Sequence, residues 1–170
     1  DLIVGGVIAD LGVADGTDTQ ERNRRFFHAP DVALVKRGAD NKAFELAVTI
    51  GSGFRASPLS NVTEDKFFML RQRAVFGGPA SYNKLTLSDL YDATDNRVGD
   101  GVDASGAAVS QVDARTDLNA KEGWYIELHN DAAAGEKVLS TPLSLDNTVT
   151  FITYTPNPGI VDCRAVAGVS

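Results

Sequence analysis

The clearest alternation of hydrophobic and polar positions lies in the last third of the chain. Trp124–Leu128 shows the two-residue period of a β-strand. A second extended run covers Val138–Leu145, and the turn pair Asp146–Asn147 separates it from Thr148–Tyr154, which is rich in β-branched and aromatic residues. Pro156 then ends the pattern, because proline cannot donate to a strand ladder. We predict an antiparallel meander of three strands.

Four further apolar runs precede it, and each predicts a strand: Leu2–Leu11, Asp31–Lys36, Ala43–Ile50 and Lys66–Phe76. The third run has its bulky residues on one face and Glu45, Ala47 and Thr49 on the other, so one side is expected to be wet or tightly packed. The fourth run begins with apolar residues on both faces. That pattern suits a strand between two layers, and a helix is the alternative.

Helix is predicted in one place only. Leu85–Ala93 offers Thr86 or Ser88 as an N-cap and one or two turns of helix. Asp95–Glu122 is poor in bulky apolar residues and predicts a long exposed insertion, with Ala104–Asn119 mobile. Trp124 follows it, and we expect its ring to be largely buried between sheets.

The order of these elements predicts an all-β fold. Antiparallel four-stranded sheets at this spacing are typical of a β-propeller, of which residues 1–170 would hold about two blades as a single segment; a β-sandwich is the alternative. Both ends of the chain have the pattern of an interrupted domain, so we expect a fragment of a larger protein. Its two uncovered blade faces would be lined by residues such as Phe44, Leu46, Phe67 and Met69.

The amino-acid composition and net charge limit the classes of partner that we expect for this chain. The 170 residues are 43% hydrophobic and 23% charged, and the net charge of −7 is that of a soluble globular chain without a basic stripe. Nucleic acid is therefore not an expected partner, and Arg22, Arg24 and Arg25 are interpreted as a local salt-bridged or solvated group beside Glu21. No apolar run approaches the length of a membrane span. Cys163 is either a buried thiol or half of a bridge.

Catalytic and phosphate-binding patterns are weak. His28 and His129 are far apart in the chain, and no serine lies in a strand–turn–helix GxSxG context. Ile50–Phe54 (IGSGF) lacks the lysine of a phosphate-binding loop and predicts a turn that ends a strand. We therefore predict no catalytic and no cofactor-binding residue.

Two groups of acidic residues are dense enough to be examined as calcium loops. Neither has the DxDxDG spacing with a closing carboxylate that such a loop needs. We interpret both as solvated acidic loops and predict no metal ligand; their members are Asp92, Asp95, Asn96, Asp100, Gly101 and Asp103 in one group and Asp10, Asp15 and Asp18 in the other.

Ordered blocks of sequence resemble the C-terminal β-propeller of PilY-family type IV pilus biogenesis proteins. These blocks are RNRRFFHAPDVAL (22–34), IGSGFRASPL (50–59), DKFFMLR (65–71), and GWYIEL, GEKVLSTPL and FITYTPNP with Cys163.

The resemblance implies an extracellular, pilus-associated propeller that is not an enzyme and that supports pilus assembly and surface attachment. Its partners would be the rest of the propeller, pilin or minor pilin subunits, and host or abiotic surfaces. The family's calcium loop would lie upstream of residue 1, so no cofactor is expected within this segment. The family's RGD tripeptide is replaced by Arg37-Gly38-Ala39-Asp40.

Quinoprotein dehydrogenases share the propeller architecture, so a fragment of such an enzyme is the alternative function. These enzymes need a calcium ion, a quinone and stacking aromatic residues. Trp124 is the only tryptophan in the chain, and no ligand cluster accompanies it.

Overall fold

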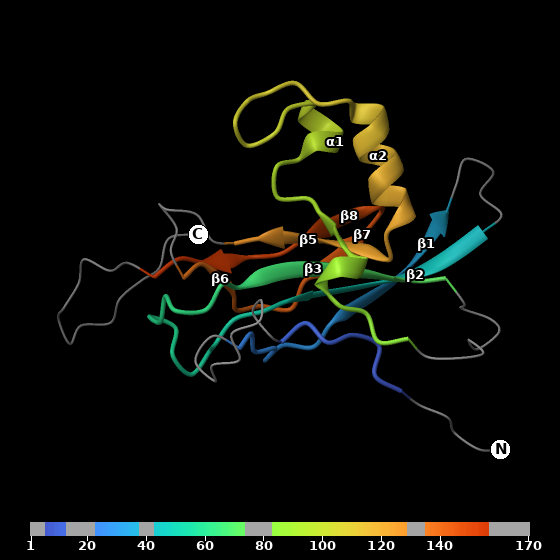
Figure 1. Cartoon of the computed structure of the whole chain (residues 1–170). Helices are drawn as coiled ribbons and strands as arrows, with labels where there is room; N and C mark the ends of the chain where they lie inside the picture. Colours follow the sequence, from blue (N-terminus) through green and yellow to red (C-terminus); the bar gives the residue numbers. More distant parts are fainter. Residues whose placement is uncertain (1–5, 13–22, 38–42, 74–82, 129–134, 157–170) are drawn as a thin grey trace, which may run out of the picture.

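A computed structural model describes residues 6–12, 23–37, 43–73, 83–128 and 135–156. In these ranges the chain is mostly β, with one mixed five-stranded sheet and two small antiparallel sheets (Figure 1). The predicted predominance of β structure is confirmed. No closed barrel or propeller is formed by the residues that the structure describes.

The five-stranded sheet organises the molecule. Its strand order is β1-β2-β3-β5-β4, and the first four strands run antiparallel to their neighbours while β4 is parallel to β5. The bounds are β1 Asp31–Arg37, β2 Ala43–Gly51, β3 Lys66–Gln72, β4 Tyr91–Asp92 and β5 Gly123–Glu127.

Hydrophobic cores form on both faces of this sheet. On one face Phe68 and Leu70 pack with Leu11 and Leu90. On the other face Phe67 packs with Val138 and Leu128, and its ring stacks on that of Phe151 with centroids 3.9 Å apart. Phe67 and Phe68 are both 0% exposed, because consecutive strand residues point to opposite, equally covered faces. The predicted buried strand is confirmed, and the helical alternative is wrong.

In β2, the face that carries small and polar residues is more buried than the face that carries bulky apolar residues. Its small and polar residues Glu45, Ala47 and Thr49 are buried, whereas Phe44 is 39% exposed. The hairpin formed later in the chain covers the polar face, where the hydroxyls of Thr49 and Ser144 are hydrogen-bonded at 3.1 Å. Of the two outcomes predicted for that side, tight packing is the one observed.

The predicted three-stranded meander is wrong. β5 has β3 on one edge and β4 on the other, so no edge remains for the strand that follows it. The later residues form two separate ladders instead, interrupted near Pro142. β6 Lys137–Val138 pairs with β9 Thr153–Tyr154, and β7 Leu143–Leu145 pairs with β8 Thr148–Thr150.

The turn between β7 and β8 is as predicted. Asp146 and Asn147 have φ values of 49° and 59°. Two successive left-handed residues match the twist of a two-residue hairpin, and Asp and Asn tolerate this conformation better than most side chains.

The prediction of a single helical segment is wrong. Leu85–Ala93 contains only the 3-10 turn η1 (Leu87–Asp89), capped reciprocally by Thr86 and Asp89, and then continues as β4. The supposed insertion contains α1 (Arg97–Asp100) and α2 (Gln111–Ala120).

Helix α2 has little apolar surface, which is why its sequence resembles a loop. Ser110 caps its start by accepting a hydrogen bond from the Asp113 amide, and only Ala114 is fully buried. This cap offsets part of what the missing hydrophobic stripe would contribute.

Near the N-terminus, the segment that the structure describes is not a strand. Ala9 makes a single parallel bridge to Leu85, so the strand predicted for Leu2–Leu11 is not found in residues 6–11. Among the described ranges, no helix combines the length and apolar character needed to cross a bilayer.

Candidate functional site

Four buried polar residues meet below the loop that follows β2. Arg24, Ser52, Asp65 and Lys137 come from four separate stretches of the chain, and each is at most 3% exposed. We call them the polar core. Burying ionisable groups is costly unless each is paired, so their partners decide whether the group is structural or reactive.

Ser52 and Asp65 join the end of β2 to the start of β3. The Ser52 hydroxyl donates to Asp65 Oδ1 at 2.7 Å and accepts from the Lys66 amide at 2.9 Å. Burial raises the pKa of Asp65, while the Ser52 hydrogen bond and the positive charges of Lys137 and Arg24 oppose that rise. The serine hydroxyl is therefore occupied by the carboxylate and the backbone.

Lys137 is held by backbone oxygens. Its Nζ donates to the carbonyls of Pro58 at 3.0 Å, Ser60 at 2.7 Å and Gly135 at 2.5 Å. These three donations use every N–H of the ammonium group. Burial lowers the pKa of Lys137, and the negative charge of Asp65 opposes that shift.

Arg24 anchors the segment before β1. Its Nε donates to the Glu64 carbonyl at 2.8 Å, and its Nη1 reaches the Leu11 carbonyl at 3.3 Å. A guanidinium group that bonds carbonyls fixes chain segments and leaves little of its charge for a substrate.

The glycines of IGSGF allow β6 to approach this core. A Cβ on Gly51 would lie 2.4 Å from Val138 Cβ, and one on Gly53 would lie 2.5 Å from the Val138 carbonyl oxygen. The amides of Ser52 and Gly53 donate to the carbonyls of Lys66 and Arg25, so neither is free to bind phosphate. β2 ends at Gly51, as predicted for this stretch, and the turn itself follows from Phe54 to Ser57.

A second ionic group lies where β3 meets α2. Arg71 and Arg73 flank Glu45 at 3.6 and 3.8 Å, and Arg73 also pairs with Glu122 at 3.0 Å. Both arginines donate to backbone carbonyls at the C-terminal end of α2, where positive charge stabilises a helix. Sequence analysis missed this group, although Arg71 and Arg73, two residues apart on a strand, had to share a face.

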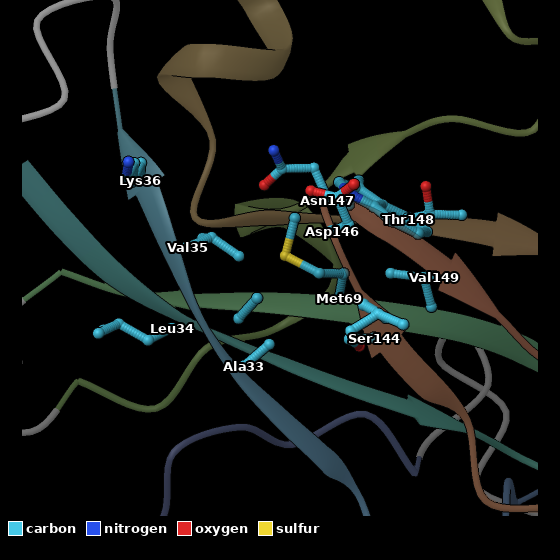
Figure 2. Close-up of a pocket in the computed structure, with 13 residues that line it drawn as sticks. Ala33, Leu34, Val35, Lys36, Met69, Ser144, Asp146, Asn147, Thr148 and Val149 are labelled. Atoms are coloured by element: carbon cyan, nitrogen blue, oxygen red, sulfur yellow. The ribbon is translucent and has the colours of Figure 1, made fainter.

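A cavity of about 470 Å³ lies against the sheet (Figure 2). It lies between the sheet and the β7–β8 hairpin. Its wall is formed by Ala33, Val35, Ala47 and Met69 from the sheet, and Asp146 and Asn147 stand at its rim. The sheet side of the cavity is apolar, so its chemistry suits contact with an apolar group.

Trp124 lies between this cavity and a second one of about 420 Å³ under α1 and α2. Its ring packs on Phe67 at 6.1 Å, but the residue is only half-buried. Trp124 is neither fully buried nor exposed, so the predicted largely buried ring is confirmed in part.

The acidic residues examined as calcium ligands are used in local turns. Asp92 Oδ1 accepts from the amide and hydroxyl of Thr94, and Asp95 pairs with Arg97 at 2.9 Å. Asp103 accepts three hydrogen bonds from Ser105 and Ala107, which lower its pKa. Over the described ranges, no three His, Cys, Asp or Glu side chains gather as a metal group would.

The remaining candidates are separated or lie outside the described residues. Asp10 pairs with exposed Lys84 at 2.8 Å, and His28 is half-buried before β1. Arg22, Asp15, Asp18, His129, Cys163 and the Gly38–Asp40 turn lie outside the described residues.

Comparison of the chain with protein-family models, with curated proteins and with solved structures found no match.

Proposed function

We propose that this chain is a non-catalytic segment of an extracellular β-propeller that supports type IV pilus assembly and surface attachment. The observation that carries the proposal is the origin of the polar core. Arg24, Ser52, Asp65 and Lys137 come from four different blocks that resemble the PilY family, and the fold brings all four together.

Such convergence favours a shared fold over a chance likeness of short motifs. Each block contributes either a buried charge or the hydroxyl that binds one, and buried charges are stable only with matched partners. A resemblance that includes all members of one buried network is therefore more specific than four independent matches.

The same network favours a structural or binding role over catalysis. Lys137 binds three carbonyls and Ser52 binds Asp65, so the buried nucleophile and the buried amine both have fixed partners. On this proposal the chain works through its surface. Its partners are the rest of the propeller, pilin or minor pilin subunits and external surfaces, and the family's calcium site lies upstream of residue 1.

Binding of purified minor pilin subunits to the immobilised chain tests the proposal. We expect saturable binding that weakens in a Lys137→Met variant, because the change destabilises the fold, while Arg115→Ala, an exposed change on α2, binds like the natural chain. Absence of binding to every pilin subunit of the source organism would contradict the pilus assignment.

A parallel assay addresses the dehydrogenase alternative. The chain is incubated with pyrroloquinoline quinone and calcium, and then examined for quinone absorbance and for dye-linked oxidation of alcohols. The proposal predicts neither signal above that of the protein without quinone. A stoichiometric quinone spectrum with turnover would favour the enzyme instead.

A further inference from the structure

An arginine–aromatic surface covers the outside of the polar core. The Arg25 guanidinium lies 3.9 Å from the centroid of the Phe54 ring, and the ring of Phe27 stacks on the same ring at 6.0 Å and 23°. Phe27 is 49% exposed, and exposed Arg55 follows Phe54 in the chain. We call Arg25, Phe27, Phe54 and Arg55 the stacked surface.

The stacked surface is held in place from below. The Gly53 amide donates to the Arg25 carbonyl at 2.8 Å, which joins the two segments that carry the surface. Two successive turns follow, from Phe54 to Ser57 and from Ser57 to Ser60. Lys137 then binds the carbonyls of Pro58 and Ser60 from inside the molecule. Side chains presented on a fixed loop lose little conformational entropy on binding.

Its chemistry differs from that of the rest of the chain. The net charge is −7, yet this surface carries Arg25 on the ring of half-buried Phe54, with exposed Arg55 next in the chain and exposed Phe27 alongside. Within the part of the chain that the structure describes, Arg55 forms no ion pair. Leu59, four residues later in the same loop, is 55% exposed. After Arg55, the next carboxylates in the chain are exposed Glu64 and buried Asp65, whereas Arg25 lies between Glu21 and Asp31 in the sequence.

We propose that the stacked surface binds an acidic protein segment that carries apolar side chains. The exposed guanidinium of Arg55 complements a carboxylate, and Phe27 offers an aromatic contact of the kind that dominates protein interfaces. The inference does not depend on the pilus assignment. Nucleic acid fits less well, because two arginines on an acidic chain do not form the basic stripe that a phosphate backbone requires.

Selection from a random peptide library displayed on phage, against the full immobilised chain, tests this inference. We expect enriched peptides in which Asp or Glu stands next to Leu, Phe or Trp. Phe27→Ala and Arg55→Glu should each weaken binding of the enriched peptide at least about tenfold. Arg55 is exposed, so its variant keeps the test decisive even if Phe27→Ala disturbs the fold.

Matched controls come from α2, which stands at the top of the view in Figure 1 while the loop after β2 lies at the lower left. Val112→Ala and Arg115→Glu change exposed residues of the same two kinds there and should leave affinity unchanged. The inference is overturned if no peptide is enriched, if enriched peptides are not acidic, or if all four variants bind alike. Tighter binding of single-stranded DNA than of peptide, lost in Arg55→Glu, would also overturn it.

Discussion

Lys137 shows at the scale of one residue how a buried charge can define a fold. Its ammonium group binds carbonyls from two loops, and its pKa is lowered by burial. The group is fully enclosed, so its hydrogen bonds are not exchanged for bonds to water. Removing the charge leaves three carbonyls without a donor.

We therefore expect Lys137→Met to lower the free energy of unfolding by about 3 kcal/mol, since each buried carbonyl left unpaired costs on the order of 1 kcal/mol or more. Urea unfolding followed by tryptophan fluorescence measures the change. Lys121→Met, which removes an ammonium group from a half-buried lysine that donates to one carbonyl in a solvent-exposed hydrogen bond, is the matched control and should cost far less. Equal urea midpoints for both variants would show that the hydrogen bonds from Lys137 to its three carbonyls do not stabilise the fold.

Asp65 gives a pH-dependent prediction. Burial raises its folded-state pKa above the unfolded value of 3.8. Its contribution to stability is therefore fully present below pH 3.8 and is lost as the pH rises through the folded-state pKa. Relative to Asp65→Asn, which stays neutral, the natural chain should lose stability over that window. Urea midpoints of both proteins across the acidic range measure it, and a difference that grows in the opposite direction would refute the assigned cause.

At the scale of elements, the sequence predicted those features that depend on residues close together in the chain. The Asp146–Asn147 turn and the strand beginning at Lys66 were foreseeable because backbone conformation and burial on both faces leave direct marks in the sequence. The pairing of β6 with β9 was not, because it depends on β5 having both edges occupied by strands distant in sequence. The polar core was equally hidden, since a lysine or aspartate in a sequence gives no sign of being buried.

Helix α2 was missed because its stability comes from its ends. Ser110 caps the start, and Arg71 and Arg73 bind carbonyls at the other end. The mobile stretch predicted for Ala104–Asn119 must therefore be revised over most of its length. We expect slower amide exchange in the second half of α2 than in Ala104–Ala108.

Replacing the cap tests the same element. Ser110→Ala should destabilise the helix by about 1 kcal/mol, seen as faster exchange of the α2 amides, while Ser105→Ala, outside the helix, should leave those amides unchanged. Uniformly fast amide exchange from residue 104 to 120 in the natural chain would instead show that the whole stretch is mobile, as predicted from the sequence.

At the scale of the whole molecule, exposed apolar side chains lie on both sides of the sheet. Leu34 is 53% exposed next to Phe44 on one face, and Leu145 is 71% exposed beside Leu143 on the outer side of the hairpin. Of the four residues predicted to line uncovered faces, Phe44 is exposed, and Leu46 and Met69 are half-buried. Phe67, named among their residues, is fully buried because Phe151 and Val138 cover it.

Such surfaces favour association. We expect the isolated chain to form concentration-dependent oligomers in sedimentation velocity, and the double change Leu143→Ser and Leu145→Ser to reduce them. Val112→Ser on α2, an isolated exposed residue, is the control and should change nothing. A chain that stays monomeric at all concentrations would contradict the prediction that these exposed apolar faces drive association.

The proposed role in pilus assembly is tested most directly by counting surface pili in the source organism, a bacterium on this account, after its gene for this chain is deleted. We predict loss of pili and of surface attachment. The natural gene and an Arg115→Ala gene should restore both, whereas a Lys137→Met gene should restore neither. A deletion strain that keeps its full number of pili and attaches normally would contradict the proposed function.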